Sequence, residues 1–334
     1  MNKIAALNLL KKSLNQEKEH WESVIDKACN ENAWFLRSNV EKALAAIEME
    51  FLDDTKLEKW LGNYEIPEDK NKRVGLIMAG NLPLVGFADW LAVFMSGNIA
   101  VVKCSDKDKV LFPAMMDKLN ELAPELSQKT IITERLKDYD AVIATGSNNS
   151  SIYFESYFKH VPHIIRKNRA SVAILNEDDG DEVILKVGED IHAYFGLGCR
   201  NVSKIYVPQG YDVKRLLAQW EKQSDNIYFN KYKNNFDYNL SLYMLNKIPF
   251  YTDDNLILVE DKSLFSRISC IHFEYYQSHE ELISTLKDNL DDIQCIVSIQ
   301  EIADFKVTPP GETQHPGLLD YADNVDTMKF LQEL

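Results

Sequence analysis

Cys199 is the residue whose surroundings are best suited to covalent chemistry. It stands in the segment His-Ala-Tyr-Phe-Gly-Leu-Gly-Cys-Arg-Asn at 192–201, ahead of the apolar run 204–207. This pattern predicts the end of a helix, a sharp turn at Gly196 and Gly198, the cysteine and a short strand. A thiolate on such a turn, with its own N–H aimed at a substrate oxygen, is the minimum needed for acyl transfer through a thioester. The segment alone is also consistent with a buried structural thiol.

Two series of strands that alternate with helices must position this cysteine. Apolar residues recur at threes and fours over 1–64, which predicts helices. The first series has strands at 74–79, 99–103, 130–133 and 141–145 and helices at 87–96 and 111–122. The second has strands at 171–175, 204–207, 255–259, 269–274 and 294–298 and helices at 181–194, 213–223 and 280–290. Continuous Val/Ile runs between helices predict parallel, doubly wound α/β sheets.

The composition argues against several classes of function. The net charge is −15, from 37 basic and 52 acidic residues, which disfavours nonspecific nucleic-acid binding. The five cysteines are scattered and form no Cys-x-x-Cys pair, so neither a metal site nor a disulfide framework is indicated. No apolar run reaches membrane-spanning length, and the N-terminus has no long apolar signal region. We therefore expect a cytoplasmic protein with reduced thiols.

Four motifs in order resemble the aldehyde dehydrogenase superfamily. Gly-Asn-Leu-Pro-Leu at 80–84 resembles its "W-N-F-P-L" turn, and Ser-Gly-Asn-Ile-Ala-Val-Val-Lys-Cys-Ser at 96–105 resembles "G-N-x-V-V-x-K-P-S". Thr-Gly-Ser at 145–147 matches its "T-G-S" turn. Gly196, Cys199, Lys204 and Val207 follow its nucleophile pattern "G-Q-x-C-x-x-x-x-R-x-x-V". The resemblance implies a Rossmann-type cofactor domain plus an α/β catalytic domain, with a helical N-terminal region.

Within that superfamily the chain is most similar to the acyl-CoA reductases of the bacterial-luminescence (lux) type. The similarity lies in Gly-Cys-Arg at 198–200, in Tyr-Val-Pro at 206–208 and in the tail 314–330, although Asn324 stands where a glycine is expected. It implies reduction of a fatty acyl-CoA to the aldehyde by NAD(P)H through an acyl-cysteine. It also implies a homo-oligomer, expected to be a dimer. Other functions stay open: a dehydrogenase for a small semialdehyde or acyl phosphate, or a non-catalytic nucleotide-binding relative.

The resemblance assigns a catalytic pair. Cys199 would be the nucleophile that forms the thioester and releases CoA. Asn81 would donate its side-chain amide to the developing oxyanion, together with the backbone N–H of Cys199. The alternative for Asn81 is a turn-forming residue. His192 is a weaker acid–base candidate, otherwise a structural histidine.

The resemblance also assigns cofactor contacts. Lys103 and Ser105 match "K-P-S", where the lysine would bind the adenosine ribose or a 2′-phosphate; the proline is replaced by Cys104. Gly146 and Ser147 would let the pyrophosphate approach a helix N-terminus, although a turn and an N-cap explain them as well. No glutamate stands where some NAD-preferring relatives bind the ribose, so NADPH is expected in preference to NADH.

The chain has one strongly basic segment, and it lacks one acidic residue that hydrolytic relatives carry. The basic segment, 159–169, carries four positive charges and no acid; it would hold CoA or cofactor phosphates, or serve as a solvated linker. Hydrolytic aldehyde dehydrogenases carry a water-activating glutamate in "E-L-G-G-K", and the matching stretch 164–169 has no acid. This absence favours transfer to CoA over hydrolysis.

We expect a helical and NAD(P)-binding part at 1–168, a catalytic domain at 169–307, and a tail at 308–334 that returns to the cofactor domain or to a subunit interface.

Overall fold

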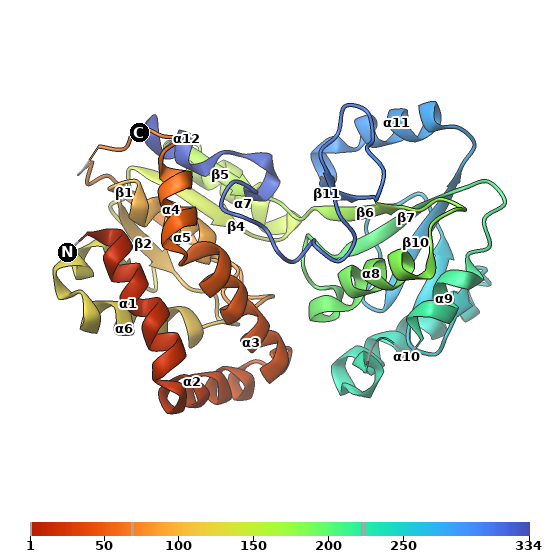
Figure 1. Cartoon of the computed structure of the whole chain (residues 1–334), viewed down its shortest axis with the longest axis horizontal. Helices are drawn as coiled ribbons and strands as arrows, with labels where there is room; N and C mark the ends of the chain where they lie inside the picture. Colours follow the sequence, from red (N-terminus) through yellow and green to blue (C-terminus); the bar gives the residue numbers. More distant parts are fainter. Residues whose placement is uncertain (1, 68–69, 222, 224) are drawn as a thin grey trace. The chain divides into compact units, whose positions relative to one another are not determined.

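The computed structural model describes residues 2–67, 70–221, 223 and 225–334. The chain folds into two compact units, residues 1–168 with 315–334, and residues 169–314. We call them unit 1 and unit 2 and describe each by itself. Their elements are labelled in Figure 1.

Unit 1 is built on a parallel five-stranded sheet in the order β3-β2-β1-β4-β5. Its strands are β1 (Arg73–Ile77), β2 (Ile99–Lys103), β3 (Thr130–Ile132), β4 (Ala141–Thr145) and β5 (His163–Arg166). The helices are α1 (Lys3–Gln16), α2 (Lys18–Glu31), α3 (Arg37–Ala46), α4 (Asp54–Leu61), α5 (Phe87–Met95), α6 (Leu111–Leu122), α7 (Asn148–Phe158) and α12 (Thr327–Gln332). The predicted helical start and the first four strands are thus confirmed, each within a few residues.

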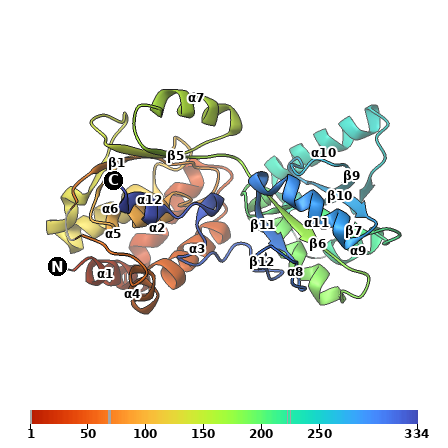
Figure 2. The ribbon, with the colours of Figure 1, turned by 90° about the horizontal axis from the view of Figure 1, so that it is seen from above.

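Both faces of this sheet are covered, which is why its strands are apolar runs without alternation. Leu76, Val102 and Ile143 face a core that also contains α5, α6 and α12. Val142 and Ala144 face a smaller cluster with Phe158 of α7. In Figure 2, α7 lies on one side of the sheet, and α5 and α12 lie on the other.

Unit 2 contains a seven-stranded sheet in the order β12-β11-β6-β7-β10-β9-β8, parallel except for the β8–β9 pair. Its strands are β6 (Ala170–Ile174), β7 (Val202–Pro208), β8 (Tyr251–Thr252), β9 (Ile257–Glu260), β10 (Cys270–Tyr276), β11 (Ile293–Val297) and β12 (Val307–Thr308). Its helices are α8 (Asp181–His192), α9 (Lys214–Trp220), α10 (Asn230–Leu245) and α11 (His279–Asp288). The central strands contribute to separate cores, one shared with α8 and α9 and one with α11.

Some elements differ from the sequence-based expectations. The sequence indicates only the start of α7, after Gly146 and Ser147, and no helix for α10, because their polar and aromatic residues follow no clear apolar period. The short strands β8 and β12 are not expected from it either. The basic segment is not a linker throughout, since its residues His163–Arg166 form the edge strand β5. The reason is that Ile164 and Arg166 are both buried, Ile164 in the sheet core and Arg166 with the partners described below.

Candidate functional site

Five of the predicted site residues lie at one edge of the unit 1 sheet. Asn81 follows β1, Lys103 ends β2 with Ser105 just beyond, and Gly146 and Ser147 follow β4. All these strands are parallel, so their carboxyl ends share an edge. The strand order reverses between β1 and β4, and such a switch point is where open α/β sheets bind ligands.

The Asn81 turn is held by the loop that follows β2. Leu84 adopts a left-handed φ of 57°, and its N–H donates to Asp108 Oδ2 at 2.9 Å. Gly80 is so close to this loop that a Cβ there would lie 2.6 Å from Ser105 Oγ. Asp108 is itself buried, which raises the pKa of its carboxyl. Asp108 was not identified from the sequence, because its hydrogen-bond partner lies 24 residues away.

Two of the predicted cofactor residues, Lys103 and Ser105, differ in the contacts that they make. Lys103 is exposed and forms no ion pair with any residue that the structure describes. Ser105 Oγ accepts a hydrogen bond from the N–H of Lys107 at 3.2 Å and packs on Gly80, so its first role is to support the Asn81 turn. Nothing in these contacts prevents Ser105 from also facing a ligand.

Ser147 begins α7 as its N-cap, its Oγ accepting the N–H of Ser150 at 3.3 Å. The first turn of α7 contains no acidic residue, so the positive end of its dipole is not offset. A Cβ on Gly146 would lie 2.8 Å from Ser150 Cβ and 2.9 Å from the Phe154 ring. Close packing of α7 on β4 therefore requires this glycine, whether or not a phosphate binds beside it.

The basic segment is not a uniform phosphate-binding patch. Arg166 is 3% exposed and pairs with both carboxylate oxygens of Asp89, at 2.6 and 3.0 Å. It also donates to Ala322 O and Thr327 Oγ1 in the C-terminal tail. The basic segment was expected to hold CoA or cofactor phosphates. Arg166 is not available for that role, because its guanidinium is buried in unit 1 and binds Asp89 and the C-terminal tail. Lys167 and Lys159 remain exposed, Lys167 with Glu155 at 4.0 Å.

Cys199 lies in unit 2, on a turn between α8 and β7. The turn contains three successive left-handed residues, Tyr194 (φ 49°), Phe195 (φ 61°) and Gly196 (φ 72°). Tyr194 and Phe195 are not glycines, so the strained backbone begins before Gly196, where the sequence placed the turn. The Cys199 carbonyl accepts a hydrogen bond from Ser171 Oγ at 2.9 Å, which ties the turn to the start of β6.

The five cysteines differ in exposure and in the pKa of their thiols. Cys199, Cys29 and Cys104 are partly exposed, whereas Cys270 and Cys295 are buried. Burial raises the pKa of Cys104 to about 11 and that of Cys270 to about 12, and it also raises the pKa of Cys29. These three are therefore poor nucleophiles at neutral pH, because the thiolate is the reactive form.

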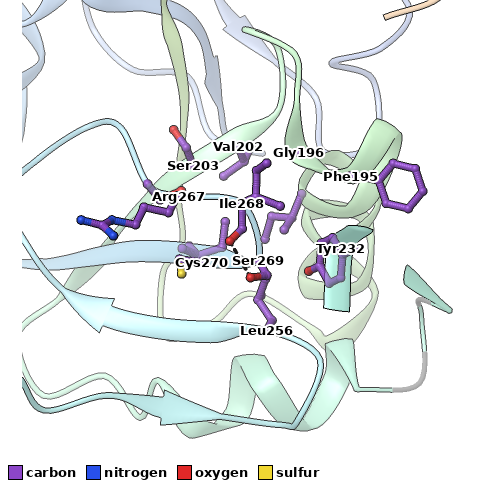
Figure 3. A pocket seen from close by; sticks show the side chains of 13 residues that line it. Phe195, Gly196, Val202, Ser203, Tyr232, Leu256, Arg267, Ile268, Ser269 and Cys270 are labelled. Carbon is purple, nitrogen blue, oxygen red and sulfur yellow. Dashed lines mark hydrogen bonds between the residues drawn. The ribbon is translucent and has the colours of Figure 1, made fainter. Parts of the chain in front are cut away.

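A cavity of about 40 Å³ lies beside the nucleophile turn. Figure 3 shows Gly196 and Val202 on one side of it, and the segment Arg267, Ile268, Ser269 and Cys270 on another. A cavity of this size has room for a few water molecules, since each needs roughly 10–15 Å³. A long acyl chain therefore cannot be accommodated in it.

Two further polar residues of this region are structural. His192 is 9% exposed, and neither ring nitrogen has a hydrogen-bond partner among the described residues; burial lowers its pKa to about 4. Lys204, at the arginine position of the family pattern, is completely buried and pairs with Glu274 at 2.7 Å. His192 is thus poorly suited to accept a proton at neutral pH.

Across the described ranges, no three His, Cys, Asp or Glu residues are grouped so that they could hold a metal ion. The helices of those same ranges are all too short or too polar to cross a bilayer.

A family comparison identifies the N-terminal two thirds of the chain. The profile of the LuxC family, described as acyl-CoA reductase, matches residues 2–228. No curated protein shows a significant match.

Solved structures show the fold. A protein described as aldehyde dehydrogenase PutA from Anabaena variabilis is 15% identical, with a TM-score of 0.65, covering 88% of this chain and 73% of its own. A variant of aldehyde dehydrogenase C from Pseudomonas syringae, solved with NAD+ and octanal, is 11% identical, with a TM-score of 0.66 and coverages of 88% and 70%. Betaine aldehyde dehydrogenase from Staphylococcus aureus, solved with NAD+, is 12% identical, with a TM-score of 0.64 and coverages of 89% and 70%. The expected aldehyde-dehydrogenase-like fold is thereby confirmed.

Proposed function

Because the chain belongs to the LuxC family of acyl-CoA reductases, we propose that it reduces an acyl-CoA thioester to the aldehyde through an acyl group on Cys199. The lux-type resemblance found in the sequence is confirmed by this membership, which makes the protein an aldehyde-related oxidoreductase. The observation that supports an acyl group on Cys199 is the position of this residue, a partly exposed thiol on a strained turn. Three of the other cysteines have raised pKa values.

The proposed chemistry begins at Sγ of Cys199. The thiolate attacks the carbonyl carbon of acyl-CoA, the carbonyl oxygen becomes an oxyanion, and CoA leaves as its thiolate when the carbonyl reforms. A bound nicotinamide cofactor supplies a hydride to the resulting thioester. The carbon–sulfur bond to Cys199 then breaks, which releases the aldehyde and regenerates the thiolate.

Asn81 is the proposed side-chain donor to the oxyanion. Its turn is supported by Gly80 against Ser105 and by Asp108, so the amide is carried on a rigid loop rather than a mobile one. Loss of one donor of this type costs about 2.7–4 kcal/mol of transition-state stabilisation. The backbone N–H of Cys199 is the proposed second donor.

The cofactor would lie at the carboxyl edge of the unit 1 sheet. The N-terminus of α7, capped by Ser147 and without acid in its first turn, fits a pyrophosphate. Lys103 is exposed at the end of β2 and fits an adenosine ribose or its 2′-phosphate. The two relatives above that were solved with NAD+ support a nicotinamide cofactor, and the exposed ammonium of Lys103 supports NADPH as the preferred form.

The acyl-enzyme is proposed to resist water. The stretch 164–169, which matches the segment with the water-activating glutamate, has no acid, and Ile165 within it packs against the apolar cluster beneath α7. The neighbouring Arg166 is engaged by Asp89 and cannot act as a base. The substrate is proposed to be a fatty acyl-CoA, whose chain must bind outside the small cavity beside Gly196.

The test is acylation measured by intact mass. Wild-type protein incubated with a fatty acyl-CoA, without cofactor, should gain one acyl group and release CoA; the adduct should persist for minutes, transfer back to added CoA, and yield aldehyde with NADPH. Cys199→Ala should form no adduct. Cys29→Ala is the matched control and should acylate normally. An unacylated wild type that oxidises a semialdehyde or reduces an acyl phosphate, or one that only binds nucleotide, would refute the proposal.

A further inference from the structure

The turn that carries Cys199 is organised by one buried amide side chain. Asn201 is 2% exposed, and its Nδ2 donates to the carbonyls of Asp190 at 2.9 Å and Ala193 at 2.8 Å. Those carbonyls lie in the last turn of α8 and just beyond it, where helical oxygens lose their intrahelical partners. Its Oδ1 accepts the N–H of Gly198 at 2.8 Å. One side chain therefore links the end of the helix to the residue before the cysteine.

The backbone is thereby anchored one peptide group before Cys199 and again directly after it. Gly198 N–H is held by Asn201, and the carbonyl of Cys199 is held by Ser171 Oγ. Both anchors are buried side chains, Ser171 at 0% and Asn201 at 2% exposure. With the backbone fixed on either side, the main freedom left to Sγ is rotation about its own Cα–Cβ bond.

The preceding backbone explains why such anchors are needed. Tyr194 and Phe195 adopt left-handed conformations that L-residues with a Cβ avoid, and such conformations persist only where surrounding contacts enforce them. Phe195 is buried and stacks on Phe229 at 4.7 Å between ring centroids. That contact holds the start of the turn, and Asn201 holds its end.

We propose that Asn201 is a positioning residue for the nucleophile, with Ser171 as its counterpart on β6. The proposal rests on Cys199 being the acylated residue. Asn201 touches neither substrate nor cofactor; it acts by keeping Sγ aligned for attack on a bound thioester. Acylation requires that alignment, whereas alkylation by a small, freely diffusing reagent does not.

This difference provides the test. In Asn201→Ala the rate constant for acylation should fall about 10- to 100-fold, with KM within about threefold of wild type. The rate of Cys199 alkylation by iodoacetamide, followed by peptide mapping, should change less than about threefold. Asn239→Ala is the matched control: Asn239 is also 2% exposed and also donates to a carbonyl, that of Ile268, so this variant should keep both rates.

Ser171→Ala supplies the second variant, because it removes one hydroxyl and is the milder change. In this variant too, the rate of acylation should fall while the rate of alkylation stays nearly unchanged. It tests the proposal if Asn201→Ala does not fold. Folded variants that acylate at the wild-type rate, or that lose acylation and alkylation equally, would overturn the proposal. A wild type that forms no acyl adduct would instead refute the proposed function.

Discussion

At the scale of single residues, the buried His192 leads to a direct prediction of how the stability of the protein depends on pH. Its folded pKa, about 4, lies below the ordinary value of 6.5 because burial opposes the charged form. The neutral histidine therefore contributes stability above pH 6.5 that is lost as the pH falls towards 4. The shift corresponds to about 3 kcal/mol in the free energy of unfolding.

We expect His192→Leu to remove that pH dependence, because leucine has a similar volume and no proton to accept. Urea unfolding at pH 7 and pH 4.5 should show wild type losing more stability than the variant, by up to about 3 kcal/mol. His315→Leu, which changes an exposed histidine, is the control. Equal losses in wild type and His192→Leu would mean that the imidazole accepts a proton in the folded protein.

Lys103 makes a prediction about cofactor choice. If its ammonium binds the 2′-phosphate, Lys103→Ala should reduce kcat/KM for NADPH about tenfold or more and affect NADH much less. The control is Lys107→Ala, which removes another exposed lysine from the same loop. Steady-state titration of both cofactors measures the effect. A higher kcat/KM of the wild type with NADH would contradict the NADPH preference.

At the scale of elements, the loop between β2 and α6 should control the Asn81 turn. Asp108 accepts the N–H of Leu84 at 2.9 Å and, more weakly, that of Leu111 at 3.4 Å. Asp108→Ala leaves these buried donors without their acceptor, at a cost of about 1–3 kcal/mol each. We expect lower thermal stability together with slower acylation.

Asp108→Asn retains a carbonyl oxygen at the same place and should restore most of both properties. Thermal unfolding and the acylation rate are the two measurements. If Asp108→Ala were destabilised but acylated at the wild-type rate, the loop would support the fold without positioning Asn81.

At the scale of the whole chain, the C-terminal tail completes the core of unit 1. Met328 and Leu331 are 0% exposed within that core, and the Nε1–H of Trp60 donates to the hydroxyl oxygen of Tyr321 at 2.7 Å. Arg166 binds the same tail through Thr327. Residues 315–334 of the tail therefore pack within unit 1, which is the unit that holds the predicted cofactor residues, whereas residues 308–314 belong to unit 2. The dimer expected from the sequence stays a prediction.

A chain that ends at Gln314 should lose much of the stability of unit 1. Losing one buried large apolar side chain costs about 2–5 kcal/mol, and this truncation removes two. Hydrogen exchange should show reduced protection of β1, β2 and β4. A chain that ends at Gln332 keeps these contacts and is the control. Undiminished protection in the shorter chain would mean that unit 1 folds without its tail.

The sequence by itself determined the features that depend on local patterns. Apolar runs predicted β1, β2 and β4 within a few residues, and the glycines and polar residues that follow them marked one edge of a sheet. Short motifs indicated a lux-type acyl-CoA reductase with an aldehyde-dehydrogenase-like fold; the family match confirmed the family, and the solved structures confirmed the fold. Such signals are readable because strand periodicity and turn chemistry involve neighbours in the chain.

Only the tertiary structure decided the roles of those polar residues whose hydrogen-bond partners are distant in the chain. Arg166 belonged to a basic run, yet Asp89, 77 residues earlier, makes it a buried structural residue. Asp108, Ser171 and Asn201 had no local signal, because each acts on a backbone group that is distant in the chain or brought close by a turn. The physical reason is that burying a charge or an amide is favourable only when its hydrogen-bond partners are in place, and the fold supplies those partners.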